Sequence, residues 1–164
     1  MLYLLDANVL IDANRDYYPL GRVPEFWDWL IDRATKQQTK IPVEIYEEVL
    51  AGKEDKLTRW IKGNRDVLLL DENVDGELIA EVIEEGYAPD LSDVELERVG
   101  LDPFLIAYAL SNPSQRVVVT TEHSKPKKKR ANRHIPDVCR DLKVDCCNTY
   151  EFIVALNFTT SWRR

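Results

Sequence analysis

The chain has 164 residues, is 45% apolar and carries a formal net charge of −7. It is long enough to bury one hydrophobic core, so we predict a single domain spanning residues 1–164. Its apolar runs are too short to cross a bilayer, and its start lacks the pattern of a signal peptide, which favours a cytoplasmic protein with no membrane partner. The three cysteines lack the spacing of a zinc site and are expected to be reduced thiols.

Four short apolar or β-branched runs are predicted to form strands, at 2–5, 67–70, 116–121 and 144–147. Their continuous apolar character is typical of strands that are covered on both faces. Helical periodicity separates them, over 26–34, 43–52, 76–86, 103–110, 136–142 and 150–156. Strands that alternate with helices predict a parallel sheet in an α/β sandwich.

The first predicted strand ends on a carboxylate, in the sequence YLLDANVLID at residues 3–12. Ligands of parallel α/β sheets bind in the crevice beyond the carboxyl ends of the strands, which is where Asp6 is expected to lie. Asp6 is therefore a candidate site residue. The alternative is that it only caps the helix that begins near Val9.

Other acidic side chains are predicted to reach the same edge. Glu122 follows the strand 116–121, Asp102 is expected to cap the helix that begins at Pro103, and Glu44 and Glu48 share one face of the helix 43–52. Converging carboxylates repel each other, so one would bind a proton unless a cation held them. Mg²⁺ prefers such oxygen ligands and can activate water for phosphoryl chemistry.

The segments DANVLID, EEVLAG, DPFLIAYAL and VVVTTE, in this order, resemble the four acidic motifs of PIN-domain ribonucleases. The resemblance covers nearly the whole chain. It implies a three-layer α/β/α sandwich with a central parallel sheet and a Mg²⁺- or Mn²⁺-dependent endoribonuclease that hydrolyses RNA phosphodiester bonds. Many members are toxins of prokaryotic toxin–antitoxin pairs, so it also implies a homodimer and a cognate antitoxin protein.

Carried over by position, the resemblance assigns the catalytic and metal-binding roles to Asp6, Glu48, Asp102 and Glu122. Family members usually have Asp at the fourth position, so Glu122 departs from the pattern. Three further side chains are expected to support these ligands: Asn8, Thr120 and Glu44. The choice between Glu44 and Glu48 stays open at this point.

A basic segment, residues 125–133 (KPKKKRANR), contains six of the 22 Lys and Arg residues and no acidic residue. Because it directly follows a candidate metal ligand, we expect it to bind RNA phosphates without reading sequence. The cations are Lys125, Lys127, Lys128, Lys129, Arg130 and Arg133. The alternative is a solvated loop. His123 and His134 flank the segment and are expected to be structural or to contact phosphate.

Three other interpretations remain. An Asp-nucleophile phosphatase would need a second Asp where Asn8 stands, and Glu122 leaves room for an inactive RNA-binding or regulatory module. Trp27, Trp29 and Tyr17-Tyr18 could stack on bases, although core packing or a subunit contact is favoured. The acidic segment 71–97 is expected to be a solvated surface, with a minor possibility that Asp93 joins the metal site.

Overall fold

A computed structural model describes residues 1–163 of the chain. Its strands are β1 (Leu2–Leu5), β2 (Thr39–Lys40), β3 (Arg116–Val119) and β4 (Asp145–Cys147). The first half contains the helices α1 (Ala7–Asp12), η1 (Ala13–Tyr17), α2 (Pro24–Thr35), α3 (Val43–Ala51), α4 (Lys56–Gly63), α5 (Arg65–Leu68), α6 (Gly76–Glu81) and η2 (Val82–Tyr87). The second half contains the helices α7 (Asp93–Val99), α8 (Asp102–Leu110), η3 (Arg130–Asn132), α9 (Ile135–Asp141) and α10 (Thr149–Ala155).

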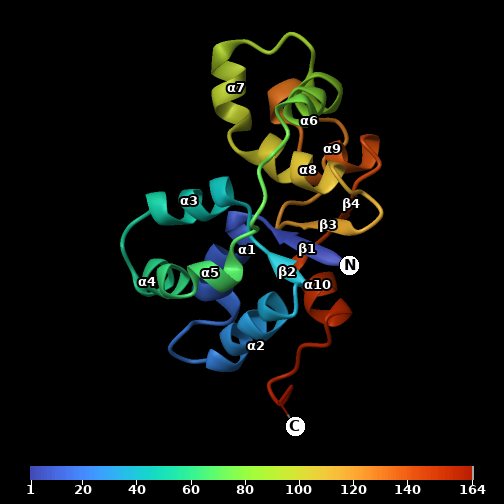
Figure 1. The fold of residues 1–164 in the computed structure, drawn as a ribbon. Coiled ribbons are helices and arrows are strands. Elements are labelled where there is room, and N and C mark those ends of the chain that lie inside the picture. Colours follow the sequence, from blue (N-terminus) through green and yellow to red (C-terminus); the bar gives the residue numbers. More distant parts are fainter. Residues whose placement is uncertain (164) are drawn as a thin grey trace.

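The strands form one parallel sheet in the order β2-β1-β3-β4. β1 and β3 are its central strands, and they pair along their full lengths from Leu2–Arg116 to Leu5–Val119. Helices α8 and α9 cover one face of this sheet, whereas α2 and α10 cover the other (Figure 1). The predicted three-layer α/β/α sandwich with a central parallel sheet is therefore confirmed.

The core lies on both faces of the two central strands. Leu4, Leu5, Val118 and Val119 are fully buried, as their unbroken apolar runs predict. On the α2 face the core is aromatic, and the ring of Trp29 contacts the rings of Phe26, Phe152 and Phe158. Burial of each such ring stabilises the fold by roughly 1.5–3 kcal/mol, so this layer fixes α2 and α10 against the sheet.

The prediction of a strand at 67–70 is wrong. The amide groups of Val67 and Leu68 donate to the Asn64 carbonyl, which closes the short helix α5, and only Leu69 forms an isolated bridge with Ile41. The edge strand next to β1 is instead the polar dipeptide Thr39–Lys40.

The apolar pattern could not indicate this strand, because its two side chains are buried through hydrogen bonds rather than apolar contacts. Thr39 Oγ1 donates to the Tyr3 carbonyl at 3.1 Å, and Lys40 Nζ donates to the Val67 carbonyl at 2.5 Å. Burial lowers the pKa of Lys40. A buried ammonium that is satisfied by a carbonyl has no hydrophobic signature.

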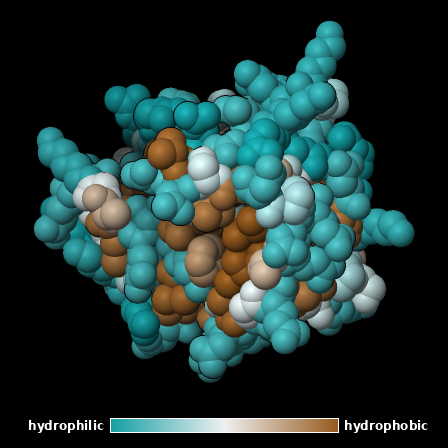
Figure 2. All heavy atoms as spheres, turned by 90° about the horizontal axis from the view of Figure 1, so that it is seen from above, coloured by the Kyte–Doolittle hydropathy of each residue, from teal (hydrophilic) through white to brown (hydrophobic). Residues whose placement is uncertain are grey.

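The surface is largely hydrophilic. On the face seen from above, towards α6 and α7, apolar residues gather in a central patch with a hydrophilic surround (Figure 2). Among exposed apolar residues, Val94 and Leu96 belong to α7. Within residues 1–163, no helix combines the length and the apolar character that crossing a membrane requires.

Candidate active site

The carboxyl ends of β1 and β3 lie next to each other, and a polar residue follows each strand. The Asp6 amide donates to the Val119 carbonyl at 2.9 Å, which continues the pairing of the two strands by one residue. Thr120 directly follows β3, so Asp6 and Thr120 leave the sheet side by side. This is the sheet edge at which the sequence predicts the site.

Thr120 links two of the predicted acidic residues. Its hydroxyl donates to Asp6 Oδ2 at 2.8 Å and accepts from the Glu122 amide at 3.1 Å. Asp6 and Thr120 are both buried. The Asp6 side chain makes no capping hydrogen bond to α1, although Asp6 occupies the N-cap position, so a capping role does not account for its burial. Asn8, predicted to support Asp6, is exposed on the first turn of α1.

Asp102 belongs to α8, which covers the face of the sheet opposite to α2 and α10. The structure corrects its expected role as an N-cap, because Asp102 is the first residue of α8 and makes no cap hydrogen bond. Its Oδ2 atom lies 3.5 Å from the hydroxyl of Tyr87, the last residue of η2. Tyr87 is buried, and that burial together with the Asp102 charge raises its pKa, so its hydroxyl stays protonated and can donate. The sequence analysis missed Tyr87.

Helix α3 supplies the remaining acid, and the structure separates its two candidates. The charge of Glu48 raises the pKa of both Asp6 and Asp102, which places this side chain on the site. Glu48 is largely exposed, and partial burial raises its own pKa. Glu44 lies instead near Tyr108, whose pKa is raised to about 12 by burial and by Glu44. The structure therefore favours Glu48 as the site residue on this helix.

These side chains form an acidic cluster, which we call the carboxylate edge: Asp6, Glu48, Asp102 and Glu122. Burial, only partly offset by the Thr120 hydrogen bond, and repulsion from Glu48 and Glu122 raise the pKa of Asp6 to about 6. Burial and the charges of Asp6, Glu122 and Glu48 raise the pKa of Asp102 to about 8. In the described part of the chain, no Lys or Arg forms a salt bridge with any of the four.

The four carboxylates fit a divalent cation by their chemistry rather than by preformed coordination. Across residues 1–163, no three His, Cys, Asp or Glu side chains are already placed to bind one ion. The cluster nevertheless consists of oxygen donors, and among residues 1–163 no Lys or Arg forms a salt bridge with them. A hard cation such as Mg²⁺ or Mn²⁺ would relieve the repulsion that raises the pKa of Asp6 and Asp102.

Glu122 is held by the start of α9. The Ile135 amide donates to Glu122 Oε2 at 2.8 Å, and His134 Nδ1 lies 3.8 Å from the same oxygen. His134 Nδ1 is buried without a hydrogen-bond partner among the described residues. Glu122 therefore also satisfies a free amide at a helix terminus, a role that the longer Glu side chain can reach from the end of β3.

A second anchor that the sequence analysis missed is Asp137 in α9. Its buried carboxylate accepts hydrogen bonds from Ser124 Oγ and the Lys125 amide, both at 2.6 Å. Burial alone would raise the pKa of Asp137, but these hydrogen bonds and Arg140 lower it. Asp137 thus fixes the path of the chain just after Glu122, where the basic segment begins.

The basic segment contains arginines that are paired with carboxylates, which we call tied, and lysines that have no such partner among residues 1–163, which we call free. Arg130 donates to Glu95 and Asp90, with distances of 2.7 Å to each carboxylate. Arg133 donates to the Gly86 carbonyl and to Asp141. Four lysines are exposed, and within residues 1–163 no carboxylate pairs with their ammonium groups: Lys125, Lys127, Lys128 and Lys129.

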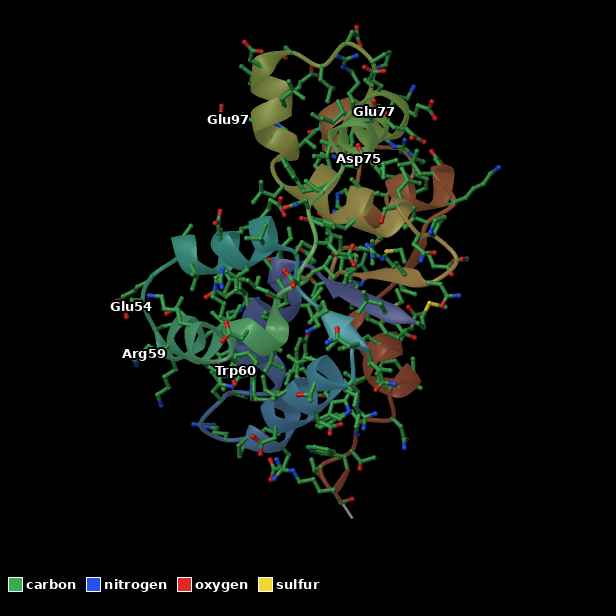
Figure 3. The ribbon with its side chains drawn as sticks, viewed as in Figure 1. Glu54, Arg59, Trp60, Asp75, Glu77 and Glu97 are labelled. Atoms are coloured by element: carbon green, nitrogen blue, oxygen red, sulfur yellow. The ribbon has the colours of Figure 1, made fainter. Side chains whose placement is uncertain are left out.

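The acidic segment 71–97, which we call the acidic arm, is mainly a solvated surface. Asp75, Glu77 and Glu97 are exposed on the helices α6 and α7 and at their ends (Figure 3). Asp93 begins α7 and is exposed, and its charge is not among those that shift Asp6 or Asp102. The acidic arm therefore pairs with Arg130 rather than extending the carboxylate edge.

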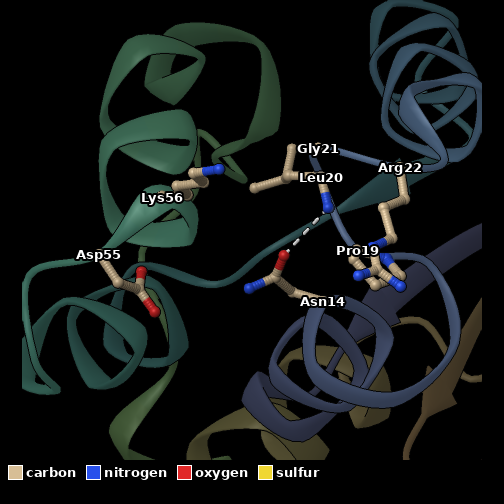
Figure 4. A pocket seen from close by; sticks show the side chains of 7 residues that line it. All are labelled: Asn14, Pro19, Leu20, Gly21, Arg22, Asp55 and Lys56. Atoms are coloured by element: carbon tan, nitrogen blue, oxygen red, sulfur yellow. Dashed lines mark hydrogen bonds between the residues drawn. The ribbon is translucent and has the colours of Figure 1, made fainter.

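A cleft of about 420 Å³ lies away from these residues, between the loop after η1 and the start of α4 (Figure 4). Asn14 Oδ1 accepts from the Leu20 amide at 3.1 Å, and Asp55 accepts from the Thr58 amide as the cap of α4. Its acceptors are thus used within the protein, and we assign no chemistry to it. The three cysteines are free thiols, of which Cys139 is buried and Cys146 and Cys147 are partly buried.

Comparison with curated proteins yields no match. A family model described as a domain of unknown function, DUF4411, matches residues 3–160. This span includes all four residues of the carboxylate edge and the whole basic segment. The chain therefore belongs to the DUF4411 family.

Proposed function

We propose that this protein is a metal-dependent endoribonuclease that hydrolyses RNA phosphodiester bonds. The observation that carries the proposal is the carboxylate edge. The charges of Glu48 and Glu122 act on Asp6 and Asp102 where the parallel strands end, and no Lys or Arg among residues 1–163 forms a salt bridge with these four acids. Such a cluster opposes folding unless it serves a ligand, so it is a candidate for function.

Each residue has a role in this proposal. Asp6, Glu48, Asp102 and Glu122 would hold Mg²⁺ or Mn²⁺, which when bound activates water and offsets charge on the phosphate. Thr120 orients Asp6 and the turn that leads to Glu122, and Tyr87 orients Asp102. Outer hydrogen bonds of this kind hold ligands in place, and their loss commonly weakens metal binding or activity by about 10- to 100-fold.

The substrate class follows from the basic segment. Its four free lysines follow Glu122 in the chain within a few residues, so they would supply positive charge for a polyanion that the acidic cluster alone would repel. Phosphate contacts from lysine give affinity without sequence reading. The roles as toxin of a toxin–antitoxin pair and as homodimer rest on the resemblance to PIN-domain ribonucleases and stay predictions.

Cleavage of mixed cellular RNA tests the proposal, with Mg²⁺ or Mn²⁺ and with excess chelator. We expect cleavage only with free metal. Mn²⁺ should also raise the melting temperature of the wild-type protein and not that of Asp6→Asn, because a ligand that binds only the folded state stabilises it.

Two other outcomes would replace the proposal. Metal-independent binding of RNA without cleavage would indicate the RNA-binding module that the Glu122 departure leaves open. Turnover of small phosphate monoesters without RNA cleavage would indicate a phosphatase. If neither Mg²⁺ nor Mn²⁺ changes the melting temperature of the wild-type protein, the mechanism does not involve a bound metal.

A further inference from the structure

An open groove of about 580 Å³ lies between the end of α1, η1, the chain after β3 and the start of α10. Thr121, which stands between Thr120 and Glu122, lines it together with His123. The opposite walls are built by Tyr17 at the end of η1 and by Tyr150 in the first turn of α10. Thr121 and His123 flank Glu122 in the chain, so the groove is lined by the same segment that carries this candidate ligand.

The aromatic residues of this region divide sharply by exposure. Trp27 and Trp29 are buried, which confirms the core packing favoured from the sequence. Tyr18 is anchored by stacking on Phe26, with ring centroids 4.5 Å apart. Tyr17 and Tyr150, in contrast, are 67% and 72% exposed, so core packing does not account for them.

Both tyrosines stand on fixed backbone. Tyr150 lies within the capping box of α10, in which the side chains of Asn148 and Glu151 accept from each other's backbone amides at 2.9 Å. Tyr17 precedes the amide of Tyr18, which closes the π-helical turn on the Ala13 carbonyl at 2.6 Å. A flat ring on a rigid support loses little conformational entropy when another ring stacks on it.

Charge around the groove favours one orientation of a polyanion. Arg15 is paired with Asp12 and Asp16 at 2.8 and 2.7 Å, so the η1 wall has a net negative charge. On the other wall, His123 is followed in the chain by the basic segment, whose exposed lysines lie outside the lining of the groove. Phosphates would therefore follow the lysine side and bases would turn towards the tyrosines.

We propose that this groove, which we call the tyrosine groove, is a nucleobase subsite for single-stranded RNA, with Tyr17 and Tyr150 as stacking platforms. The proposal rests on the ribonuclease function above and adds how the substrate is held. Its volume lies within the range of roughly 300–1,000 Å³ typical of sites for small ligands. Only an unpaired strand can turn its bases out to stack on aromatic rings. Double-stranded RNA would bind through its phosphates alone.

The test compares a short oligoribonucleotide with an abasic ribose–phosphate oligomer of equal length, both in chelator so that neither is cleaved. The wild-type protein should bind the base-containing oligomer at least about tenfold more tightly, since one stacked base contributes roughly a fivefold to hundredfold gain. The double variant Tyr17→Ala/Tyr150→Ala should reduce this preference to about twofold or less. Its affinity for the abasic oligomer should not change.

Two controls separate stacking from other effects. Tyr150→Phe keeps the ring and should keep the preference. Val154→Ala alters another exposed side chain of α10, 59% exposed and outside the groove, and should change nothing. Equal binding of the two oligomers by the wild type, or an undiminished preference in the double variant, would overturn the nucleobase subsite while leaving phosphate binding in place. Failure to bind either oligomer would overturn the nucleobase subsite and phosphate binding by the lysines, whereas the cleavage assay above decides the ribonuclease proposal separately.

Discussion

Two acidic regions of this protein have opposite electrostatic behaviour. At the carboxylate edge, burial and like charges raise the pKa of Asp6 to about 6 and that of Asp102 to about 8. In the acidic arm, hydrogen bonds from Arg130 and from the Ser92 amide lower the pKa of the partly exposed Glu95 to about 2. Acidic composition alone therefore does not indicate a site. What distinguishes the carboxylate edge is that, among residues 1–163, no Lys or Arg forms a salt bridge with its acids. In the acidic arm, by contrast, Glu95 binds Arg130.

The largest expected effect is the loss of cleavage in Asp6→Asn. This change removes a ligand charge, so RNA cleavage should fall by at least about hundredfold. The fold should remain or become slightly more stable, because the change also relieves carboxylate repulsion. Cleavage rates and melting temperatures measured on the same preparations check this. Asp93→Asn in the acidic arm is the matched control and should retain full cleavage. Full activity in Asp6→Asn would remove Asp6 from the site.

A second comparison lies within α3. Glu48→Gln should lower cleavage by about 10- to 100-fold, because the charge of Glu48 acts on Asp6 and Asp102. Glu44→Gln should lower it by less than about threefold, since Glu44 acts on Tyr108 instead. Rates at saturating RNA and metal distinguish the two. The reverse order would mean that the ligand lies one helical turn earlier.

A third test uses stability in chelator and concerns Asp102. The folded protein binds a proton on Asp102 up to about pH 8, whereas a free Asp carboxyl has a pKa of 3.8. The native state therefore binds more protons than the unfolded chain between these values, and stability falls as the pH rises through this window. Asp102→Asn removes this loss, so its free energy of unfolding should exceed that of the wild type by about 1–3 kcal/mol above pH 8.

The same variant should show no advantage below pH 4, where the carboxyl is protonated in both states. Urea titrations at several pH values measure the difference, and the Asn side chain can still accept from the Tyr87 hydroxyl. Asp93→Asn should follow the wild-type curve throughout. A pH-independent gain in Asp102→Asn would show that repulsion at the carboxylate edge is not its cause.

Sequence patterns predicted most of the elements whose burial is apolar, but they missed α4, in which Leu57 and Ile61 are buried. β1, β3 and β4 lie where continuous apolar runs place them, and the helices at 26–34, 43–52, 103–110, 136–142 and 150–156 are present with shifts of one or two residues at their ends. The polar strand β2 was missed because its Thr39 and Lys40 are buried by hydrogen bonds. Hydrophobic sequence patterns indicate only residues that are buried by apolar contacts.

The residues of the candidate site likewise include some that the sequence could predict and some that it could not. Its acids could be located because strand ends and helix starts are visible in the sequence. The groups that orient them could not, because Tyr87 contacts Asp102, and Thr120 contacts Asp6, only through the tertiary fold. Thr120 was suggested by the family resemblance, whereas Tyr87 and Asp137 gave no local signal. Likewise, six cations of the basic segment looked equivalent until the fold paired Arg130 and Arg133.

The smallest expected effect concerns RNA affinity and its salt dependence. It should differ between variants of the free lysines and variants of the tied arginines. Each lysine of the free set changed to Gln should weaken binding of single-stranded RNA by about threefold and reduce the salt slope by about 0.7 unit. Lys127→Gln and Arg130→Gln form a matched pair on one loop. The Lys127 variant should change the slope, whereas Arg130→Gln should leave it almost unchanged, because the Arg130 charge is already offset by Asp90 and Glu95.

Cleavage at saturating RNA should separate these variants further. A lysine remote from the reacting phosphate binds ground and transition states about equally, so its loss raises KM and leaves kcat nearly intact. Arg130→Gln instead removes the salt bridges between the acidic arm and the basic segment. This change should disturb the backbone that follows Glu122, so its effect on cleavage should appear in kcat. Binding isotherms over a salt series, with kinetics on the same two variants, measure both quantities. An equal loss of salt slope in Lys127→Gln and Arg130→Gln would show that Arg130 exchanges its acidic partners for RNA, and the contrast between paired and unpaired charge would then fail at this loop.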